Sequence, residues 1–344
     1  MMTMTRLNAV RYGLPLLAVV LFTLPSMAAD KDRIIQTNSA GDSVHLIDPV
    51  TNKVVGVIPG IEVAHGAAAA PDGSRIYVSN EADSTVDVVD VKTLKVIKKI
   101  PLSGHPNNIA IGRDGRRVYV GIAQAPGGLD VIDTIALERV KTIPGTGSVH
   151  NVYVTPDGKY AVTGSTGQRV VTVIDTQSEQ IAWPLGFEWG IRPMTFSHNP
   201  DGSTKWMFVQ LGDFHGFAVV DFQTRQELTR ITLPDLPPGK ATVPAGSNVS
   251  HGMAVTADQK TLVVCSRLNN VLYAYSLPDL KLLGGADLSG KGAAWVTVTL
   301  DGKTAYVANP VTDDVSVVDI KSLREIARIS VGAVPKRNVT VRLQ

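Results

Sequence analysis

The sequence predicts an all-β fold, a seven-bladed β-propeller with four antiparallel strands in each blade. Two internal repeats, which run at independent phases of the chain, predict this fold. The first repeat is an alternating apolar strand that ends in a polar residue, and it occurs seven times. Its copies end at Asp48, Asp90, Asp133, Asp175, Asp221, Ser276 and Asp319, so the spacings are 42, 43, 42, 46, 55 and 43 residues. A unit of about 40–45 residues that contains four short strands is typical of a propeller blade.

The second repeat is a strand–turn–strand unit centred on Asp-Gly. Its six copies are Asp72-Gly73, Asp114-Gly115, Asp157-Gly158, Asp201-Gly202, Asp301-Gly302 and the variant Asp258-Gln259. Asp and Gly suit tight hairpins because Asp hydrogen-bonds its neighbouring backbone and Gly accepts left-handed angles. The third unit shows all four expected strands in order, as HNVYVT, KYAVTGS, VVTVID and QIAWPL.

The two repeats together predict how the propeller closes. Seven strands of the first kind accompany only six hairpins of the second kind, so one inner strand is missing from the count. The C-terminal segment KRNVTVRL, residues 336–343, supplies it, and residues 32–39 and 43–48 complete the same blade. Pairing the two ends of the chain in one blade removes the open sheet edges that promote aggregation.

The first 29 residues differ from the rest and predict a signal peptide. Arg6 and Arg11 precede the apolar run LPLLAVVLFTL, which is followed by small residues up to Ala29. A positive start, a short apolar stretch and small residues at the exit are typical of secretory signals. We therefore expect residues 1–29 to be removed or, alternatively, retained as an N-terminal anchor. We expect residues 30–344 to form a single propeller domain that is periplasmic or secreted.

Charge and cysteine content limit the expected partners. The chain has 33 basic and 31 acidic residues, and loss of Arg6 and Arg11 leaves 31 of each. A net charge near zero gives no reason to expect nucleic acid as a partner. No later segment is long and apolar enough to span a membrane. Cys265 is the only cysteine and lies in an apolar strand, so we expect it to be a buried structural residue in a monomer without disulfides.

The segments that follow the Asp-Gly turns resemble a known family. IYVSN at 76–80, VYVGI at 118–122 and AYVAN at 305–309 are similar to the repeat of the YVTN β-propeller family, often described as lactonase-like or surface-layer-like. The resemblance covers essentially all of residues 30–344 and implies the fold. It implies little about function, because related propellers include lactonases, heme-binding and copper-binding reductase domains and plain binding modules.

Three histidines occupy equivalent positions in the repeat. Counting back seven residues from each turn aspartate gives His65, Asn107, His150, Met194, His251 and Ala294, and Lys336 corresponds to them in the last strand. Equivalent positions of inner strands point at one central channel. His65, His150 and His251 can therefore converge on a metal, for which zinc or copper is expected with three imidazole ligands. The alternative is that they are polar residues lining a wet channel.

Further polar and aromatic residues are predicted at the same mouth of the channel. These are His105, Arg192, Trp295, Lys336, Glu81, Asp213, His215 and Arg267. Arginine, lysine, histidine and tryptophan together favour a small anionic or planar ligand. The long segment at residues 235–250 leads into His251 and is either a lid over this mouth or surface decoration.

Three functions remain open from the sequence. The first is a periplasmic binding or accessory protein that holds a small ligand, a metal or a protein partner through its histidine cluster. The second is a metal-dependent hydrolase, lyase or oxidoreductase that uses the same histidines, with Arg192 or Lys336 holding an anionic substrate. The third is a protein-interaction scaffold with no bound ligand. Serine or cysteine covalent catalysis is not expected, because the sequence lacks their motifs.

Overall fold

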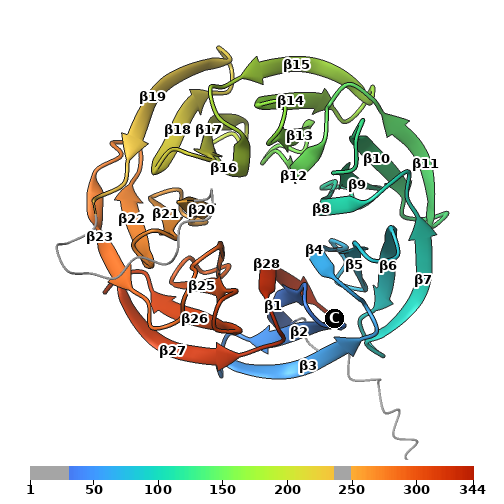
Figure 1. Ribbon diagram of the computed structural model, residues 1–344, viewed down its shortest axis with the longest axis horizontal. Helices are drawn as coiled ribbons and strands as arrows, with labels where there is room; N and C mark the ends of the chain where they lie inside the picture. Colours follow the sequence, from blue (N-terminus) through green and yellow to red (C-terminus); the bar gives the residue numbers. More distant parts are fainter. Residues whose placement is uncertain (1–30, 236–248) are drawn as a thin grey trace, which may run out of the picture.

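The chain forms a closed ring of seven four-stranded antiparallel sheets around a central channel (Figure 1). The structure is a computed structural model and describes residues 31–235 and 249–344; the segment 1–30 and most of the predicted lid lie outside the described residues. Every element of the described residues is a β-strand. Among these residues no helix is long and apolar enough to cross a membrane. The predicted fold class is confirmed.

Each blade contributes one strand to each of four concentric positions. The inner strands are β4 (Ala64–Ala69), β8 (Pro106–Ile111), β12 (Val149–Val154), β16 (Ile191–His198), β20 (Ser250–Val255), β24 (Trp295–Val298) and β28 (Pro335–Leu343). The second strands are β1 (Lys31–Asn38), β5 (Arg75–Asn80), β9 (Arg117–Ile122), β13 (Tyr160–Ser165), β17 (Thr204–Leu211), β21 (Thr261–Ser266) and β25 (Thr304–Asn309).

The two outer positions follow the same order around the ring. The third strands are β2 (Ser43–Asp48), β6 (Thr85–Asp90), β10 (Gly128–Asp133), β14 (Val170–Asp175), β18 (Gly216–Asp221), β22 (Val271–Ser276) and β26 (Asp314–Asp319). The outermost strands are β3 (Lys53–Pro59), β7 (Lys95–Pro101), β11 (Glu138–Ile143), β15 (Gln180–Gly186), β19 (Gln226–Thr232), β23 (Leu282–Asp287) and β27 (Arg324–Ser330).

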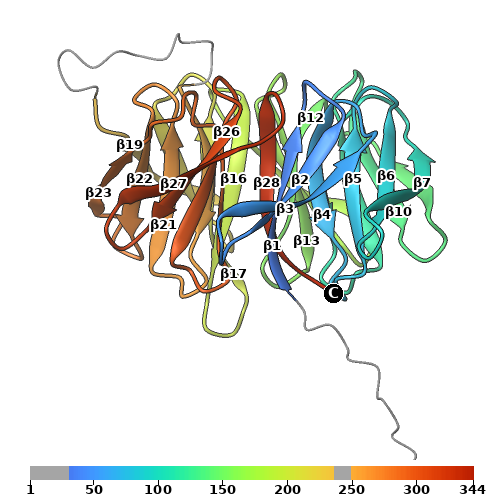
Figure 2. The same cartoon turned by 90° about the horizontal axis from the view of Figure 1, so that it is seen from below.

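The predicted closure of the ring is confirmed. One sheet has the order β28-β1-β2-β3, so the C-terminal strand is the inner strand of the blade that the N-terminal strands build. The register of β28 on β1 pairs Leu343 with Lys31 and Val339 with Ile35. Both ends of the described chain therefore emerge on the same face of the ring (Figure 2).

The core lies between neighbouring blades and consists of aliphatic and aromatic side chains from the second and third strands. Tyr77, Tyr119, Phe208 and Tyr306 are among the largest fully buried side chains. The turn glycines have positive φ, such as 70° at Gly73, as the Asp-Gly pattern predicts. Cys265 is fully buried as expected, and burial raises the pKa of its thiol.

Candidate functional site

A β-bulge in the inner strands points side chains towards the channel. The register between first and second strands is interrupted at Ala64/Ala67, Val149/Asn151 and Ser250/Met253, and each interruption contains one of the three predicted histidines. Equivalent interruptions in β8, β16 and β28 contain Asn107, Arg192 and the Lys336-Arg337 pair. A bulge leaves residues out of the sheet ladder and redirects their side chains. The repeat therefore builds a ring of channel-facing positions.

The predicted register is wrong in the fourth blade. Counting back from the turn aspartate selects Met194, which is buried in the core with 1% of its surface exposed. Strand β16 has eight residues, whereas β4, β12 and β20, which carry the histidines, have six each. The two extra residues shift the channel-facing position from Met194 to Arg192.

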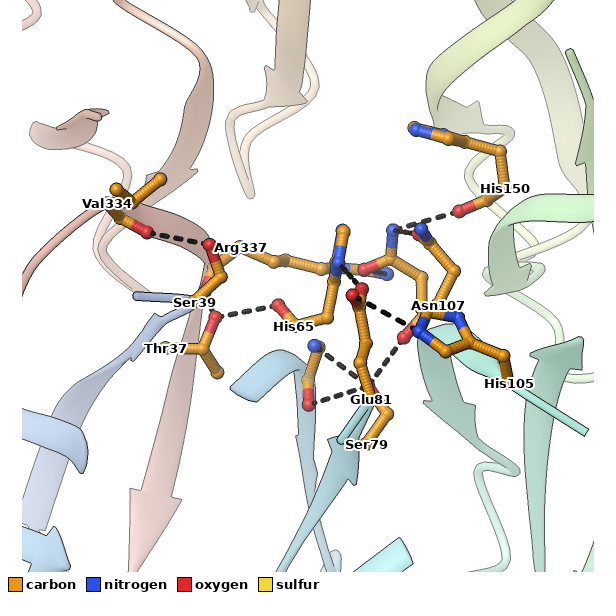
Figure 3. Close-up of polar contacts among 12 residues, drawn as sticks. Thr37, Ser39, His65, Ser79, Glu81, His105, Asn107, His150, Val334 and Arg337 are labelled. Atoms are coloured by element: carbon orange, nitrogen blue, oxygen red, sulfur yellow. Dashed lines mark hydrogen bonds and ion pairs between the residues drawn. The ribbon is translucent and has the colours of Figure 1, made fainter. Parts of the chain in front are cut away.

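The three histidines lie side by side across the channel mouth. The ring centroids of His65 and His150 are 6.4 Å apart, and those of His150 and His251 are 6.3 Å apart. Trp295 packs edge-on against His251 at 4.6 Å. Figure 3 shows His65 beside Glu81, with His150 across from it. The convergence predicted from the repeat is thus present in the geometry.

The hydrogen bonds of His65 and His251 fix their tautomers. Nδ1 of His65 contacts a carboxylate oxygen of Glu81, and Nδ1 of His251 lies 3.1 Å from the carbonyl oxygen of Ala294. A carbonyl or a carboxylate only accepts, so each Nδ1 carries the proton and each Nε2 keeps its lone pair. Neither Nε2 has a hydrogen-bond partner among the described residues.

His150 instead has a donor group beside each ring nitrogen, and a neutral ring can accept a hydrogen bond at only one of them. The side-chain amide nitrogen of Asn151 lies 2.7 Å from Nδ1, and Nη1 of Arg192 lies 3.3 Å from Nε2. Burial, together with the charge of Arg192, lowers the pKa of His150 to about 3. The pKa values of His65 and His251 are also lowered by burial, which for His65 outweighs the opposing effect of Glu81. All three imidazoles are therefore neutral at pH 7.

Three cationic side chains surround the histidines. Arg192, Arg267 and Lys336 line the same cavity, and burial lowers the pKa of each. The buried Nε atoms of both arginines have no hydrogen-bond partner. None of the residues that line the cavity is acidic. Asp213 and Glu81, which lie outside the lining, act on Arg192 and Lys336 through their charges. The excess of cations in the lining itself favours an anionic ligand.

The cavity has the size of a small-molecule site. Its volume is about 410 Å³, within the range of about 300–1,000 Å³ that is typical of such sites. Besides the histidines and cations it is lined by Ala294, Trp295, Pro310, Val311 and Val334. Apolar and aromatic walls with a few convergent polar groups are the usual composition of an organic ligand site.

Four of the predicted residues lie outside this lining. Glu81 lies behind His65, and Nε2 of His105 is 3.8 Å from the other oxygen of Glu81. Asp213 acts on Arg192 through its charge. His215 instead lies 2.8 Å from Oγ of the buried Ser266. The other predicted residues, His65, His150, His251, Arg192, Arg267, Trp295 and Lys336, all line the cavity.

The expectation of zinc or copper has no support in the geometry. Among residues 31–235 and 249–344, no group of three or more His, Cys, Asp or Glu side chains is placed to hold a metal ion. Each histidine is separated from the next by more than 6 Å between ring centroids. The sequence pattern identified the converging residues but not the distances between them.

Sequence reasoning missed two features of the site. Gly252 lets the inner strands of adjacent blades approach, because a Cβ atom there would lie 2.6 Å from the carbonyl oxygen of Ala294. The sequence signal is a glycine directly after the histidine, which also occurs at Gly66. Arg337, the neighbour of Lys336, lies deeper inside the channel, with its guanidinium 4.6 Å from the Tyr153 ring.

Comparisons with known proteins agree with the fold. A family model described as the Cytochrome D1 heme domain, a β-propeller family, matches residues 31–157. The chain is similar to Kuenenia stuttgartiensis hydrazine synthase, with 23% identity, TM-score 0.73 and coverage of 89% of this chain and 99% of that chain. It is also similar to the Pseudomonas aeruginosa periplasmic gluconolactonase PpgL, with 19% identity, TM-score 0.73 and coverage of 90% and 99%.

A third structure is the dihydro-heme d1 dehydrogenase NirN in complex with DHE. The identity is 19% and the TM-score 0.66, over 90% of this chain and 66% of that chain. The chain shares its fold with these propellers. The search of curated proteins finds no match. The YVTN repeat resemblance is not among these matches.

Proposed function

We propose that this protein is a periplasmic binding protein that holds a planar organic ligand with carboxylate groups at the histidine-lined mouth of its channel. The observation that carries the proposal is the unbalanced charge of the cavity. Three cations and three neutral imidazoles line it, and no lining residue is acidic. Arg192, Arg267 and Lys336 would bind the carboxylates, and Trp295 would contact the planar face.

A heme-type tetrapyrrole is the first candidate ligand. The partial match to the Cytochrome D1 heme domain supports it, as does the similarity to a structure that contains a heme d1 dehydrogenase. The donor set also fits, because His65 and His251 keep an unpartnered Nε2, which is the form in which imidazole ligates iron. When bound, the heme would supply its iron as the reactive or electron-carrying centre. The protein would supply orientation and charge.

A periplasmic location is part of the proposal. Residues 1–29 have the pattern of a secretory signal, and one of the similar structures is described as a periplasmic gluconolactonase. Fractionation of cells that produce the full chain, followed by mass spectrometry of its N-terminus, tests this part separately. Full-length protein retained in the cytoplasm would contradict it.

The ligand is tested with hemin, metal-free protoporphyrin IX and a neutral porphyrin ester as probes. The proposal expects saturable binding of hemin and protoporphyrin at one site per chain, quenching of Trp295 fluorescence, and much weaker binding of the ester. Replacing Arg192 and Arg267 by glutamine weakens binding at least tenfold, since a charge-assisted hydrogen bond contributes about 1.5–3 kcal/mol. The exposed Arg116→Gln variant is the control. Equal affinity of acid and ester, or no binding, contradicts the proposal.

An enzymatic role is the second candidate, favoured by the pair His65–Glu81. A carboxylate that fixes Nδ1–H leaves Nε2 as a base that can accept a proton from a bound substrate. Turnover that is lost in His65→Gln and weakened in Glu81→Gln, with ligand affinity unchanged, would favour it. A protein that binds none of the probes and turns over no substrate would favour an interaction scaffold instead.

A further inference from the structure

The opposite mouth of the channel contains a second, differently built cavity. Its volume is about 450 Å³, and its lining includes the last residues of β4, β8 and β12. Both ends of the described chain emerge on this face of the ring (Figure 2). The walls of the cavity come from β4, β8, β12 and β28 and are almost entirely apolar, as Ala69, Ile111, Val154 and Val341 illustrate. It shares no lining residue with the histidine-lined cavity.

One guanidinium lies among these apolar walls. Arg337 leaves β28 at its bulge and extends across the channel from β28 (Figure 3). Its Nη1 lies 3.3 Å from Oδ1 of Asn108 and 3.3 Å from the carbonyl oxygen of Val152. The guanidinium carbon lies 4.6 Å from the centre of the Tyr153 ring and 5.9 Å from that of Trp295. Arg337 therefore separates the two cavities.

The charge of Arg337 has no counterion among the described residues. No ion pair includes it, and no acidic residue lines the cavity. Burial lowers its pKa, yet a guanidinium does not lose its proton in proteins. A buried charge with only neutral partners is costly. A neutral side chain such as asparagine or threonine could hydrogen-bond the inner strands to one another without the cost of burying a charge.

Two donors of Arg337 have no partner among the described residues. All its hydrogen bonds to described residues are made by Nη1. Nε and Nη2 have no such partner, and neither is among the buried unpartnered atoms, so both are accessible. These two donors form the edge with which arginine binds a carboxylate in bidentate geometry. Arg113 lines the same cavity and is exposed, which adds a second cation at the rim.

We infer that this mouth is a second ligand site, which binds an organic monocarboxylate with a hydrocarbon body, its carboxylate on Arg337 and its hydrocarbon against the alanine and valine walls. The inference does not depend on the proposed function, because the two cavities have separate linings. The apolar wall excludes small inorganic anions as good ligands, since they would gain nothing from burying it. The lone deep cation selects one carboxylate rather than several.

Octanoate is the probe, with octylammonium and octanol as matched controls, and titration calorimetry with the full mature chain is the measurement. We expect saturable binding of octanoate at one site, at least tenfold weaker binding of octanol and no binding of octylammonium. Arg337→Met weakens octanoate binding at least tenfold, and the exposed-site Arg113→Glu weakens it several-fold without affecting the fold. Arg116→Gln, at an exposed position that lines neither cavity, leaves octanoate affinity unchanged.

Three results would overturn the inference. One is the absence of saturable octanoate binding; another is equal binding of octanoate and octylammonium. The third is loss of octanoate binding in Arg192→Gln while Arg337→Met retains it, which would place the probe in the histidine-lined cavity. If Arg337→Met does not fold, Ile111→Glu replaces it: a carboxylate in the wall weakens octanoate binding while Arg337 stays in place, and unchanged affinity contradicts the site.

Discussion

Nδ1 of His251 lies 3.1 Å from the carbonyl oxygen of Ala294, which belongs to the next blade. The amide nitrogen of Gly252 donates to the same carbonyl at 2.5 Å. The carbonyl oxygen of Ala294, directly before β24, therefore accepts hydrogen bonds from both the His251 ring and the Gly252 amide. Because this oxygen can only accept, it fixes the proton on Nδ1 and leaves the lone pair of Nε2 available to a ligand.

The first prediction concerns the protonation of this ring. At pH 7 the His251 imidazole is neutral with its proton on Nδ1, because burial lowers its pKa below the ordinary value. Nitrogen-15 NMR of histidine side chains measures both properties, and the His251→Gln variant assigns the signal. A spectrum with the proton on Nε2, or with titration near pH 6.5, would contradict the hydrogen bond to Ala294.

The second prediction separates ligand binding from stability at the arginines. The Nε atoms of Arg192 and Arg267 are buried without partners, so these side chains lower the stability of the ligand-free protein. Arg192→Met is therefore expected to raise the melting temperature by a few degrees, since about 1 kcal/mol corresponds to about 2–4 °C in a domain of 150–250 residues and to less in a larger one. The same variant weakens binding of carboxylate probes.

Thermal melts with and without protoporphyrin IX measure both effects of Arg192→Met. Arg116→Gln is the control, because Arg116 is exposed. A variant with lower melting temperature and unchanged probe affinity would mean that Arg192 is structural, held in place by partners outside the cavity.

The third prediction is a pH dependence of stability from His150. Its pKa is about 3 in the folded protein against 6.5 as the reference value. The unfolded chain therefore binds a proton that the folded chain does not, and stability falls as the pH drops from about 6.5 towards 3. The loss is at most about 1.4 kcal/mol for each pH unit. It is fully recovered above pH 6.5, where both states are neutral.

Urea denaturation at pH 7 and pH 5 tests this dependence. From pH 7 to pH 5 the wild-type protein should lose up to about 2 kcal/mol more than His150→Gln, which lacks the titrating ring. His198→Gln, outside the channel, should behave as the wild type does. Equal losses in wild type and His150→Gln would show that the ring is hydrated or protonated in the folded state.

The repeat explains why the fold was predictable and the site only in part. Strand alternation and Asp-Gly turns are local signals that the sequence shows directly. Counting seven third strands against six hairpins then predicted both the number of blades and the closure of the ring. The histidine positions followed because the bulge recurs at the same register. The two extra residues of β16 broke this count at Met194, since nothing in the local pattern marks a longer inner strand.

Distances across the channel are set by all seven blades together and lie beyond any local pattern. The sequence could not show how the three converging rings are oriented, and no group of metal ligands is found among the described residues. It also could not show that Arg337, six residues before Leu343, lies between two cavities rather than in solvent. A charged side chain near a chain end is normally solvated, but Arg337 belongs to the closing strand β28 and therefore lies inside the channel.

The last prediction tests the close approach of blades at Gly252. A Cβ atom there would lie 2.6 Å from the carbonyl oxygen of Ala294 and 2.7 Å from the amide nitrogen of Val296. Both are backbone atoms, so β24 must shift to accommodate Gly252→Ala. Overpacking of this kind costs about 1–3 kcal/mol. The shift also lengthens the contact of Nδ1 of His251 with Ala294.

Gly252→Ala should therefore lower both the stability to urea and the affinity for hemin, and it should weaken the Nδ1–H signal of His251. Gly167→Ala is the matched control, because a Cβ atom at Gly167 meets nothing within 4 Å and its φ is not in the left-handed region. The control should leave stability and affinity unchanged. If Gly252→Ala lost stability but kept full affinity, the carbonyl of Ala294 would not position His251 for the ligand, and the lone pair of Nε2 would have no part in binding.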